Sequence, residues 1–197
     1  MSKVVIVTGG SRGIGAATAK LLGAKGYAVC VNYLANRERA DDVADCIIRA
    51  GGRAFACQAD VSSEADVIHL FDAAEERFGK VTHLVNNAGI LFTQSKLVDI
   101  DLERFNQVLN SNVVSCFLCS REAVRRFPAG SAIVNVSSLA SQTGSPFEYV
   151  DYAASKGAMD TLTKGLSREV AGSGIRVNAV RPGFIYTDMH ADGFFFF

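Results

Sequence analysis

The chain has 197 residues, of which 49% are hydrophobic, and its 20 lysines and arginines balance its 20 aspartates and glutamates. This length suits one domain with a substantial core, over residues 1–197, and is short for two. A net charge of zero supplies no basic field for nucleic acid or anionic lipid, and no apolar run approaches the roughly 18 to 20 residues that span a bilayer. We therefore expect neither a nucleic-acid nor a membrane partner.

Short apolar runs alternate with longer helical patterns from the first residues to about residue 180. The runs, which we interpret as strands, cover residues 3–8, 28–32, 53–58, 83–86, 131–136 and 176–179. Helical periodicity begins near Gly13, Asn36, Ser63, Asp101 and Tyr149. Continuous apolar strands separated by helices are typical of a parallel sheet that is covered on both faces. The sequence thus predicts an α/β fold of three layers, a doubly wound parallel sheet between helices.

The five cysteines indicate a reducing compartment. They are odd in number and lie in apolar runs or helical patterns, unlike a secreted disulfide framework. The first apolar run meets glycines too early for a signal peptide. Cys116 and Cys119 have CxxC spacing, but no second pair or histidine cluster accompanies them. We expect a cytoplasmic protein that holds no metal.

A glycine-rich segment, Thr-Gly-Gly-Ser-Arg-Gly-Ile-Gly, joins the first strand to the first helix at residues 8–15. Glycines permit a tight turn and a close approach to a pyrophosphate, and the free N–H groups that begin a helix favour an anion. An ordinary turn is the alternative, but the strand-to-helix context favours dinucleotide binding. The expected contacts are Gly9, Ser11, Arg12, Gly13, Ile14 and Gly15.

The pattern TGxxxGxG resembles that of the short-chain dehydrogenase/reductase family. Within the family, the sequence is similar to bacterial members related to glucose and ribitol dehydrogenases. The resemblance covers essentially the whole chain and continues in the family's order through Asp60-Val61, Asn86-Asn87-Ala88-Gly89, Asn112, Ser138, Tyr152-Ala153-Ala154-Ser155-Lys156 and Pro182-Gly183. It implies a Rossmann fold, a nicotinamide cofactor and a homo-oligomer, either a dimer or a homotetramer. Family members usually continue into a further helix and strand. We therefore expect this chain, which ends in four phenylalanines at residues 194–197, to be truncated or incompletely represented.

The end of the second strand bears on which nicotinamide cofactor is bound. In a Rossmann site an acidic residue there accepts from the ribose 2′-hydroxyl of NAD and repels the 2′-phosphate of NADP. This segment carries Asn32 and Tyr33 and no acid. Arg12 and Arg37 are candidates to pair with a 2′-phosphate, the alternative being two solvated loop residues. We expect NADP(H) to be preferred over NAD(H).

The resemblance implies further cofactor contacts after the later strands. Asp60 and Val61 resemble the family's adenine contacts, with an Asx turn or a helix cap as the alternative role of the aspartate. The small residues in the Asn87-Ala88-Gly89 segment let the backbone lie close to the cofactor ribose. The neighbours implied for the nicotinamide carboxamide or a phosphate are Pro182, Gly183, Ile185 and Thr187.

Tyr152 and Lys156 are four residues apart in a helical pattern and therefore leave one face of a helix. A phenol is a poor acid near neutrality, and a nearby ammonium lowers its pKa. The pair predicts proton transfer at the oxygen of a substrate. The resemblance implies that both side chains also touch the cofactor. By resemblance Ser138, rather than its neighbour Ser137, donates to the same oxygen. Asn112 is implied to hold a water that links Lys156 to solvent, the alternative being a side chain that only satisfies local backbone.

These observations predict an oxidoreductase that uses NADP(H) to interconvert a carbonyl and a secondary alcohol (EC 1.1.1.-). The expected substrate is a small or medium apolar molecule. A dinucleotide-binding sensor and an inactive truncated homologue without turnover remain the alternatives.

Overall fold

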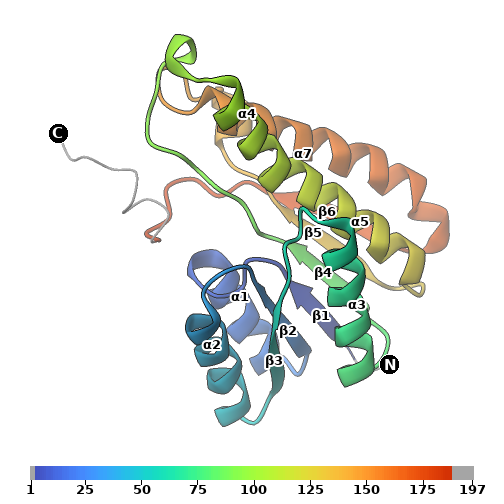
Figure 1. The fold of residues 1–197 in the computed structure, drawn as a ribbon. Coiled ribbons are helices and arrows are strands. Elements are labelled where there is room, and N and C mark those ends of the chain that lie inside the picture. Colours follow the sequence, from blue (N-terminus) through green and yellow to red (C-terminus); the bar gives the residue numbers. More distant parts are fainter. Residues whose placement is uncertain (1–2, 188–197) are drawn as a thin grey trace.

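The computed structural model describes residues 3–187, and its centre is a six-stranded parallel sheet of order β3-β2-β1-β4-β5-β6 (Figure 1). The strands are β1 (Val4–Val7), β2 (Ala28–Tyr33), β3 (Arg53–Gln58), β4 (His83–Asn86), β5 (Ala132–Val136) and β6 (Arg176–Val180). Each predicted strand agrees with the observed one to within one residue at either end. The strand order reverses direction between β1 and β4, which confirms the doubly wound sheet. Residues 194–197 lie outside the described part of the chain.

The main helices are α1 (Gly13–Ala24), α2 (Arg37–Arg49), α3 (Glu64–Phe78), α4 (Leu102–Leu109), α5 (Ser115–Arg126) and α7 (Val150–Glu169). Short segments add α6 (Ala140–Thr143), the 3₁₀ turns η1 (Leu97–Asp99) and η3 (Ala171–Ser173), and the π-helical turn η2 (Asn110–Val114). The sequence predicted one helix from Asp101 onward, but η2 divides it into α4 and α5. The sequence analysis also missed α6.

Three of the predicted helix starts are N-cap residues. The side chain of Asn36 accepts from the N–H of Arg39, and that of Ser63 accepts from the N–H of Asp66. Asp101 caps α4 in the same way. An oxygen at this position satisfies an N–H group that has no partner within the helix, so cap and helical pattern together locate these starts.

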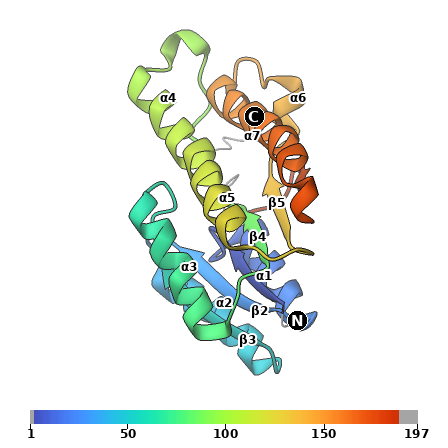
Figure 2. The same cartoon turned by 90° about the vertical axis from the view of Figure 1, so that its right-hand side faces the viewer.

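The two faces of the sheet carry separate hydrophobic clusters, because successive side chains of a strand point to opposite faces. Val4 and Ile6 of β1 pack with Phe71 of α3 in a cluster that also takes in residues of α5. Val5 of β1 packs on the other face in a cluster that includes Ile47 of α2. The sheet is thus the middle of three layers, with α1 and α2 on one side and α3, α5 and α7 on the other (Figures 1 and 2).

All five cysteines are free, and four of them are buried. Within residues 3–187, no helix has both the length and the apolar character needed to cross a membrane. Over the same residues, histidine, cysteine and carboxylate side chains form no group that could hold a metal ion.

Candidate active site

A cleft of about 950 Å³ runs along the carboxyl ends of the strands. It collects most of the predicted site residues from all parts of the chain: Gly9, Ser11, Arg12, Gly13, Ile14, Asn32, Tyr33, Asp60, Val61, Asn87, Ala88, Gly89, Ser138, Tyr152, Lys156, Pro182, Gly183, Ile185 and Thr187. Three predicted residues, Gly15, Arg37 and Asn112, do not line it. The size falls within the range of roughly 300–1,000 Å³ that is typical of ligand sites.

The glycine loop wraps tightly around the end of β1. Gly9 and Gly13 have φ values of +59° and +52°, a backbone region that residues with a side chain rarely adopt. The Gly9 N–H donates to Oδ1 of Asn32 at 3.2 Å, and Nδ2 of Asn87 donates to the carbonyl oxygens of Thr8 and Gly9 at 2.9 and 3.0 Å. The loop therefore presents backbone at the start of α1, as an anion site requires.

Gly15 acts behind the loop rather than in the cleft. A Cβ at this position would lie 2.4 Å from the carbonyl oxygen of Gly9 and 2.5 Å from Nδ2 of Asn87. The first atom is backbone, and the second belongs to an amide that is held by its hydrogen bonds to the carbonyl oxygens of Thr8 and Gly9. Gly15 is thus required for packing α1 against the loop.

The residues near the end of β2 that were predicted to select NADP occupy different environments. Asn32 is almost fully buried, and its amide donates to the carbonyl oxygen of Ala59 at 3.0 Å, so it joins β2 to β3 and the glycine loop. Arg37 forms an exposed ion pair with Asp41 at 3.3 Å and lies outside the cleft lining. Arg39, which the sequence analysis did not single out, lines the cleft instead.

Asp60 lies in the cleft lining, and one of its oxygens is engaged locally. Oδ1 accepts from both the N–H and the hydroxyl of Ser62, at 2.9 and 2.6 Å. This is the Asx turn that the sequence left as an alternative. The α3 cap is supplied by Ser63, so Asp60 does not cap the helix.

Tyr152, Lys156 and Ser138 line the cleft next to one another. The ammonium of Lys156 lies 5.5 Å from the centroid of the Tyr152 ring and donates to the carbonyl oxygen of Val136 at 2.8 Å. Ser137 is buried and donates to the carbonyl oxygen of Lys156 at 3.3 Å, so its hydroxyl is engaged within the protein. Ser138 is the more accessible of the two serines.

Burial shifts both titrating groups toward their neutral forms. It raises the pKa of Tyr152, and the Ser138 hydroxyl acts in the opposite direction. Burial also lowers the pKa of Lys156 to about 8, although Cys116 and Asp160 act to raise it. The net pKa of Tyr152 is therefore raised, and not lowered as the sequence led us to expect, because desolvation of the phenol dominates in this arrangement.

Asn112 lies behind the cleft, in the π-helical turn η2, and is fully buried. Oδ1 accepts from the N–H of Ile90 at 2.8 Å, and Nδ2 donates to the Ile90 carbonyl and to the Ser155 hydroxyl at 3.1 and 3.0 Å. A Cβ on Gly89 would lie 2.9 Å from Oδ1 of Asn112 and 3.7 Å from Nζ of Lys156. The Asn112 amide thus fixes the backbone at Gly89 and Ile90, and Gly89 lies between Asn112 and Lys156.

The segment after β6 closes over two parts of the cleft. The Pro182 carbonyl accepts from the N–H of Leu139, next to Ser138, at 2.9 Å. Thr187 reaches the glycine loop, where a Cβ on Gly13 would lie 3.3 Å from its methyl group. The structure therefore brings the predicted nicotinamide end and the predicted phosphate loop together.

Asp160 does not line the cleft but acts on Lys156, and sequence reasoning missed it. It follows Lys156 by one helical turn, and Oδ2 accepts from Ser141 at 2.7 Å and from Nε of Arg181 at 2.8 Å. Although burial acts to raise the pKa of Asp160, hydrogen bonds from these two residues outweigh it and lower that pKa. The i, i+4 spacing from Lys156 was the available signal in the sequence.

Several known proteins resemble this chain in sequence and in fold. The family model "short chain dehydrogenase" matches residues 3–194. YgfF, an uncharacterized oxidoreductase of Escherichia coli (strain K12), is 58% identical over 96% of this chain and 79% of its own length. A 3-oxoacyl-[acyl-carrier-protein] reductase of Synechocystis is 39% identical over 95% of this chain and 76% of its own. A short chain dehydrogenase from Burkholderia cenocepacia J2315, crystallised in complex with NADP, is 41% identical and superposes with a TM-score of 0.90 over 95% of this chain and 76% of that one.

Proposed function

This chain belongs to the short-chain dehydrogenase/reductase family and is an NAD(P)-dependent oxidoreductase of CH–OH and C=O groups, and within that class we propose that it prefers NADP(H) and uses Tyr152 as its acid and base. The observation that carries the proposal is the meeting of Tyr152, Lys156 and Ser138 in a cleft that also contains the glycine loop. The expected substrate is a small or medium apolar carbonyl compound or secondary alcohol. Leu91, Leu139 and Tyr149 supply apolar lining for it.

A nicotinamide dinucleotide fits the residues present. Backbone at the glycine loop would hold the pyrophosphate, Asp60 and Val61 the adenine, and Ile185 and Thr187 the nicotinamide end. When bound, the cofactor supplies or accepts the hydride. The cleft is continuous between these groups, which supports one ligand spanning them.

Tyr152 carries the proton. Its raised pKa keeps the phenol protonated at neutral pH, ready to protonate a carbonyl oxygen in the reductive direction. In the oxidative direction the same oxygen atom, after the phenol has lost its own proton, takes the hydroxyl proton of the alcohol as a phenolate. Ser138 donates to the substrate oxygen and fixes its position, and Lys156 holds positive charge beneath the ring. Asn112 positions Ser155 and Ile90 around Lys156 and is the expected site of a relay water.

The proposed preference for NADP(H) rests on charge at the end of β2. The cleft lining there includes Arg12 and Arg39 but no acid from the segment 32–39, because the one acid of that segment, Glu38, does not line the cleft. A 2′-phosphate would therefore meet guanidinium groups and no carboxylate. Arg39 replaces Arg37 in this role, because Arg39 lines the cleft and Arg37 does not.

We also propose that the protein is a cytoplasmic homo-oligomer. Its five free cysteines favour a reducing compartment. Large apolar side chains, among them Leu102, Val114 and Phe117, are exposed on α4, η2 and α5, which favours association.

The Tyr152→Phe variant tests the proton step. Removing the hydroxyl should lower the rate of NADPH oxidation with diketones or aldehydes by about 10²–10⁴-fold, because the acid is lost while the ring remains. The Kd for NADPH, measured by fluorescence, should stay within about twofold of wild type and be at least about tenfold tighter than that for NADH. Tyr27→Phe is the matched control, since Tyr27 packs on His83 away from the cleft lining.

Each component can fail separately. Turnover of Tyr152→Phe close to that of wild type would refute the acid–base role. Equal or tighter binding of NADH would refute the cofactor preference. NADPH binding without turnover of any substrate would leave a dinucleotide-binding protein.

A further inference from the structure

Arg104, near the start of α4, joins two segments that border the cleft. Nε and Nη2 donate to the two carboxylate oxygens of Asp151 at 2.7 and 3.4 Å. Nη1 donates to the carbonyl oxygen of Thr93 at 2.9 Å, and the guanidinium lies over the Phe92 ring, 5.4 Å from its centroid. One side chain thus holds the first turn of α7 and the loop that follows β4.

The ion pair is buried, with 15% of the Arg104 side chain and 1% of the Asp151 side chain exposed. Removing one partner of such a pair leaves the other charge without compensation. The forked contact also requires a guanidinium, because an ammonium cannot reach two carboxylate oxygens and a carbonyl in this planar arrangement. The two residues therefore hold each other in one geometry.

Asp151 passes this constraint to its neighbour. Its Oδ1 accepts from the backbone N–H of Tyr152 at 2.9 Å. That N–H lies in the first turn of α7, where the backbone lacks partners within the helix and the N-cap residue Tyr149 provides no side-chain cap. A carboxylate here also complements the positive end of the helix dipole. Asp151 thus fixes the backbone from which the Tyr152 phenol projects.

The other end of the contact reaches the substrate side of the cleft. Ile90 and Leu91, just before Thr93, are cleft-lining residues. The same loop is tied to the approach to α7 by the N–H of Ser95, which donates to the Glu148 carbonyl at 2.9 Å. The loop and the start of α7 consequently form one braced unit with Arg104 between them.

We propose that Arg104 and Asp151 are positioning residues of the oxidoreductase, which align the Tyr152 hydroxyl with the loop at residues 90–95 that borders the substrate. The inference rests on the proposed function of Tyr152. A misplacement of about 1 Å in a catalytic group can cost about 10²-fold in rate, so a brace at this position is expected to act on kcat.

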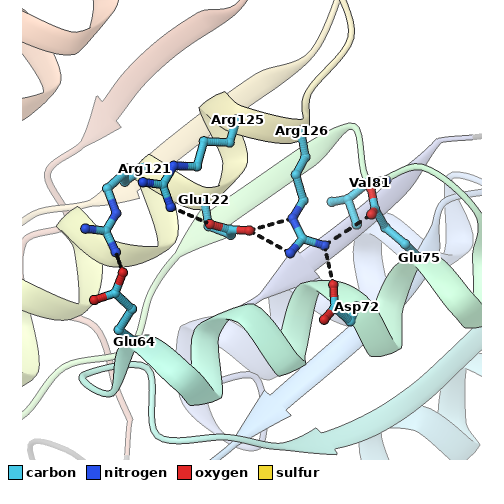
Figure 3. Close-up of polar contacts among 8 residues, drawn as sticks. All are labelled: Glu64, Asp72, Glu75, Val81, Arg121, Glu122, Arg125 and Arg126. Carbon is cyan, nitrogen blue, oxygen red and sulfur yellow. Dashed lines mark hydrogen bonds and ion pairs between the residues drawn. The ribbon is translucent and has the colours of Figure 1, made fainter.

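A chemically matched ion pair lies elsewhere and serves as the control (Figure 3). Arg126 of α5 donates to Glu122 at 2.6 Å and to Asp72 of α3 at 2.6 Å, and it lies 5.6 Å over the Phe71 ring. Its side chain is 19% exposed and that of Glu122 is 8% exposed. None of these residues lines the cleft. Arg126 therefore matches Arg104 in burial, carboxylate pairing and aromatic contact, but not in its connection to Tyr152.

The experiment compares Arg104→Gln with Arg126→Gln. Both should lower the melting temperature, but only Arg104→Gln should lower kcat, by at least about tenfold, with the Kd for NADPH within about twofold of wild type. Arg104→Lys should lose nearly as much kcat as Arg104→Gln, because lysine keeps the positive charge but not the forked guanidinium contacts to Asp151 and Thr93. Hydrogen exchange measured by mass spectrometry should rise in peptides covering residues 90–96 and 149–156 of Arg104→Gln and not of Arg126→Gln.

The outcomes separate the two proposals. A folded Arg104→Gln with wild-type kcat and unchanged exchange in these peptides would overturn the positioning role, as would an equal kcat loss in Arg126→Gln. The double variant Arg104→Gln/Asp151→Asn, which buries no lone charge, provides the same comparison if the single variant does not fold. An inactive wild-type protein would refute the proposed function, and the exchange comparison would then decide the positioning role by itself.

Discussion

Lys156 carries its positive charge in a buried environment that favours the neutral amine. Its ammonium contacts the Val136 carbonyl and, at 3.5 Å, the sulfur of Met159, and burial lowers its pKa to about 8. The positive charge beneath Tyr152 is therefore present at neutral pH and is lost as pH rises through about 8. Asp160, which is ionised through its bonds to Ser141 and Arg181, works to keep that charge in place.

The Asp160→Asn variant should change the pH dependence of the reaction. In the wild type we expect kcat/KM for carbonyl reduction to fall above pH about 8, as Lys156 loses its proton. Removing the carboxylate removes an influence that raises the pKa of Lys156, so the alkaline limb of the profile should move to lower pH. Ser141→Ala, which leaves the carboxylate in place, is the control and should keep the wild-type limb. Identical limbs in Asp160→Asn and wild type would contradict the charge argument.

At the scale of elements, the junction between β1 and α1 depends on Gly15. Gly15→Ala should weaken NADPH binding by at least about tenfold, because the added Cβ would meet the Gly9 carbonyl at 2.4 Å and displace the loop that receives the pyrophosphate. Isothermal titration measures the change in Kd. Gly165→Ala in α7 is the control: a Cβ there meets nothing within 4 Å, so it should raise the free energy of unfolding by about 0.5–1 kcal/mol and leave the Kd unchanged. Wild-type affinity in Gly15→Ala would show that the loop tolerates the shift.

Local pattern predicted these elements well and their mutual contacts poorly. Apolar runs and the caps at Asn36 and Ser63 act within a few residues, so strand positions and helix starts could be predicted from the sequence. Arg37 and Arg39 differ by two positions on the first turn of α2, and only the direction of that helix decides which of them lines the cleft. The brace between Arg104 and its partner 47 residues away depends on how α4 packs against α7, which no local pattern encodes.

At the scale of the whole molecule, one hydrophobic cluster links the two ends of the described chain. It contains Val4 of β1 and Val177 of β6 together with residues of α3 and α5. Because this cluster is shared by β1 and β6, removing either strand would expose core residues that pack against the other part of the chain. This continuity favours a single folding unit.

We accordingly expect one cooperative unfolding transition, at the same denaturant concentration by far-UV circular dichroism and by tyrosine fluorescence. If the chain is also a homo-oligomer, the midpoint should rise with protein concentration, since association stabilises the folded state by mass action. Two separate transitions would contradict the single domain. A midpoint that does not depend on concentration would contradict the oligomer.

The position of β1 in the sheet has a consequence for synthesis. β1 joins β2 on one edge, but its other edge pairs with β4, and the hydrogen bonds between Val4 and Thr82 connect residues 78 positions apart. At about 5–20 residues per second, the ribosome needs about 4–16 s to make the intervening chain. The apolar run Val4–Val7 leaves the ribosome before β4 and keeps one edge unpaired throughout this interval. It is the segment of this protein that a holding chaperone has the longest time to bind.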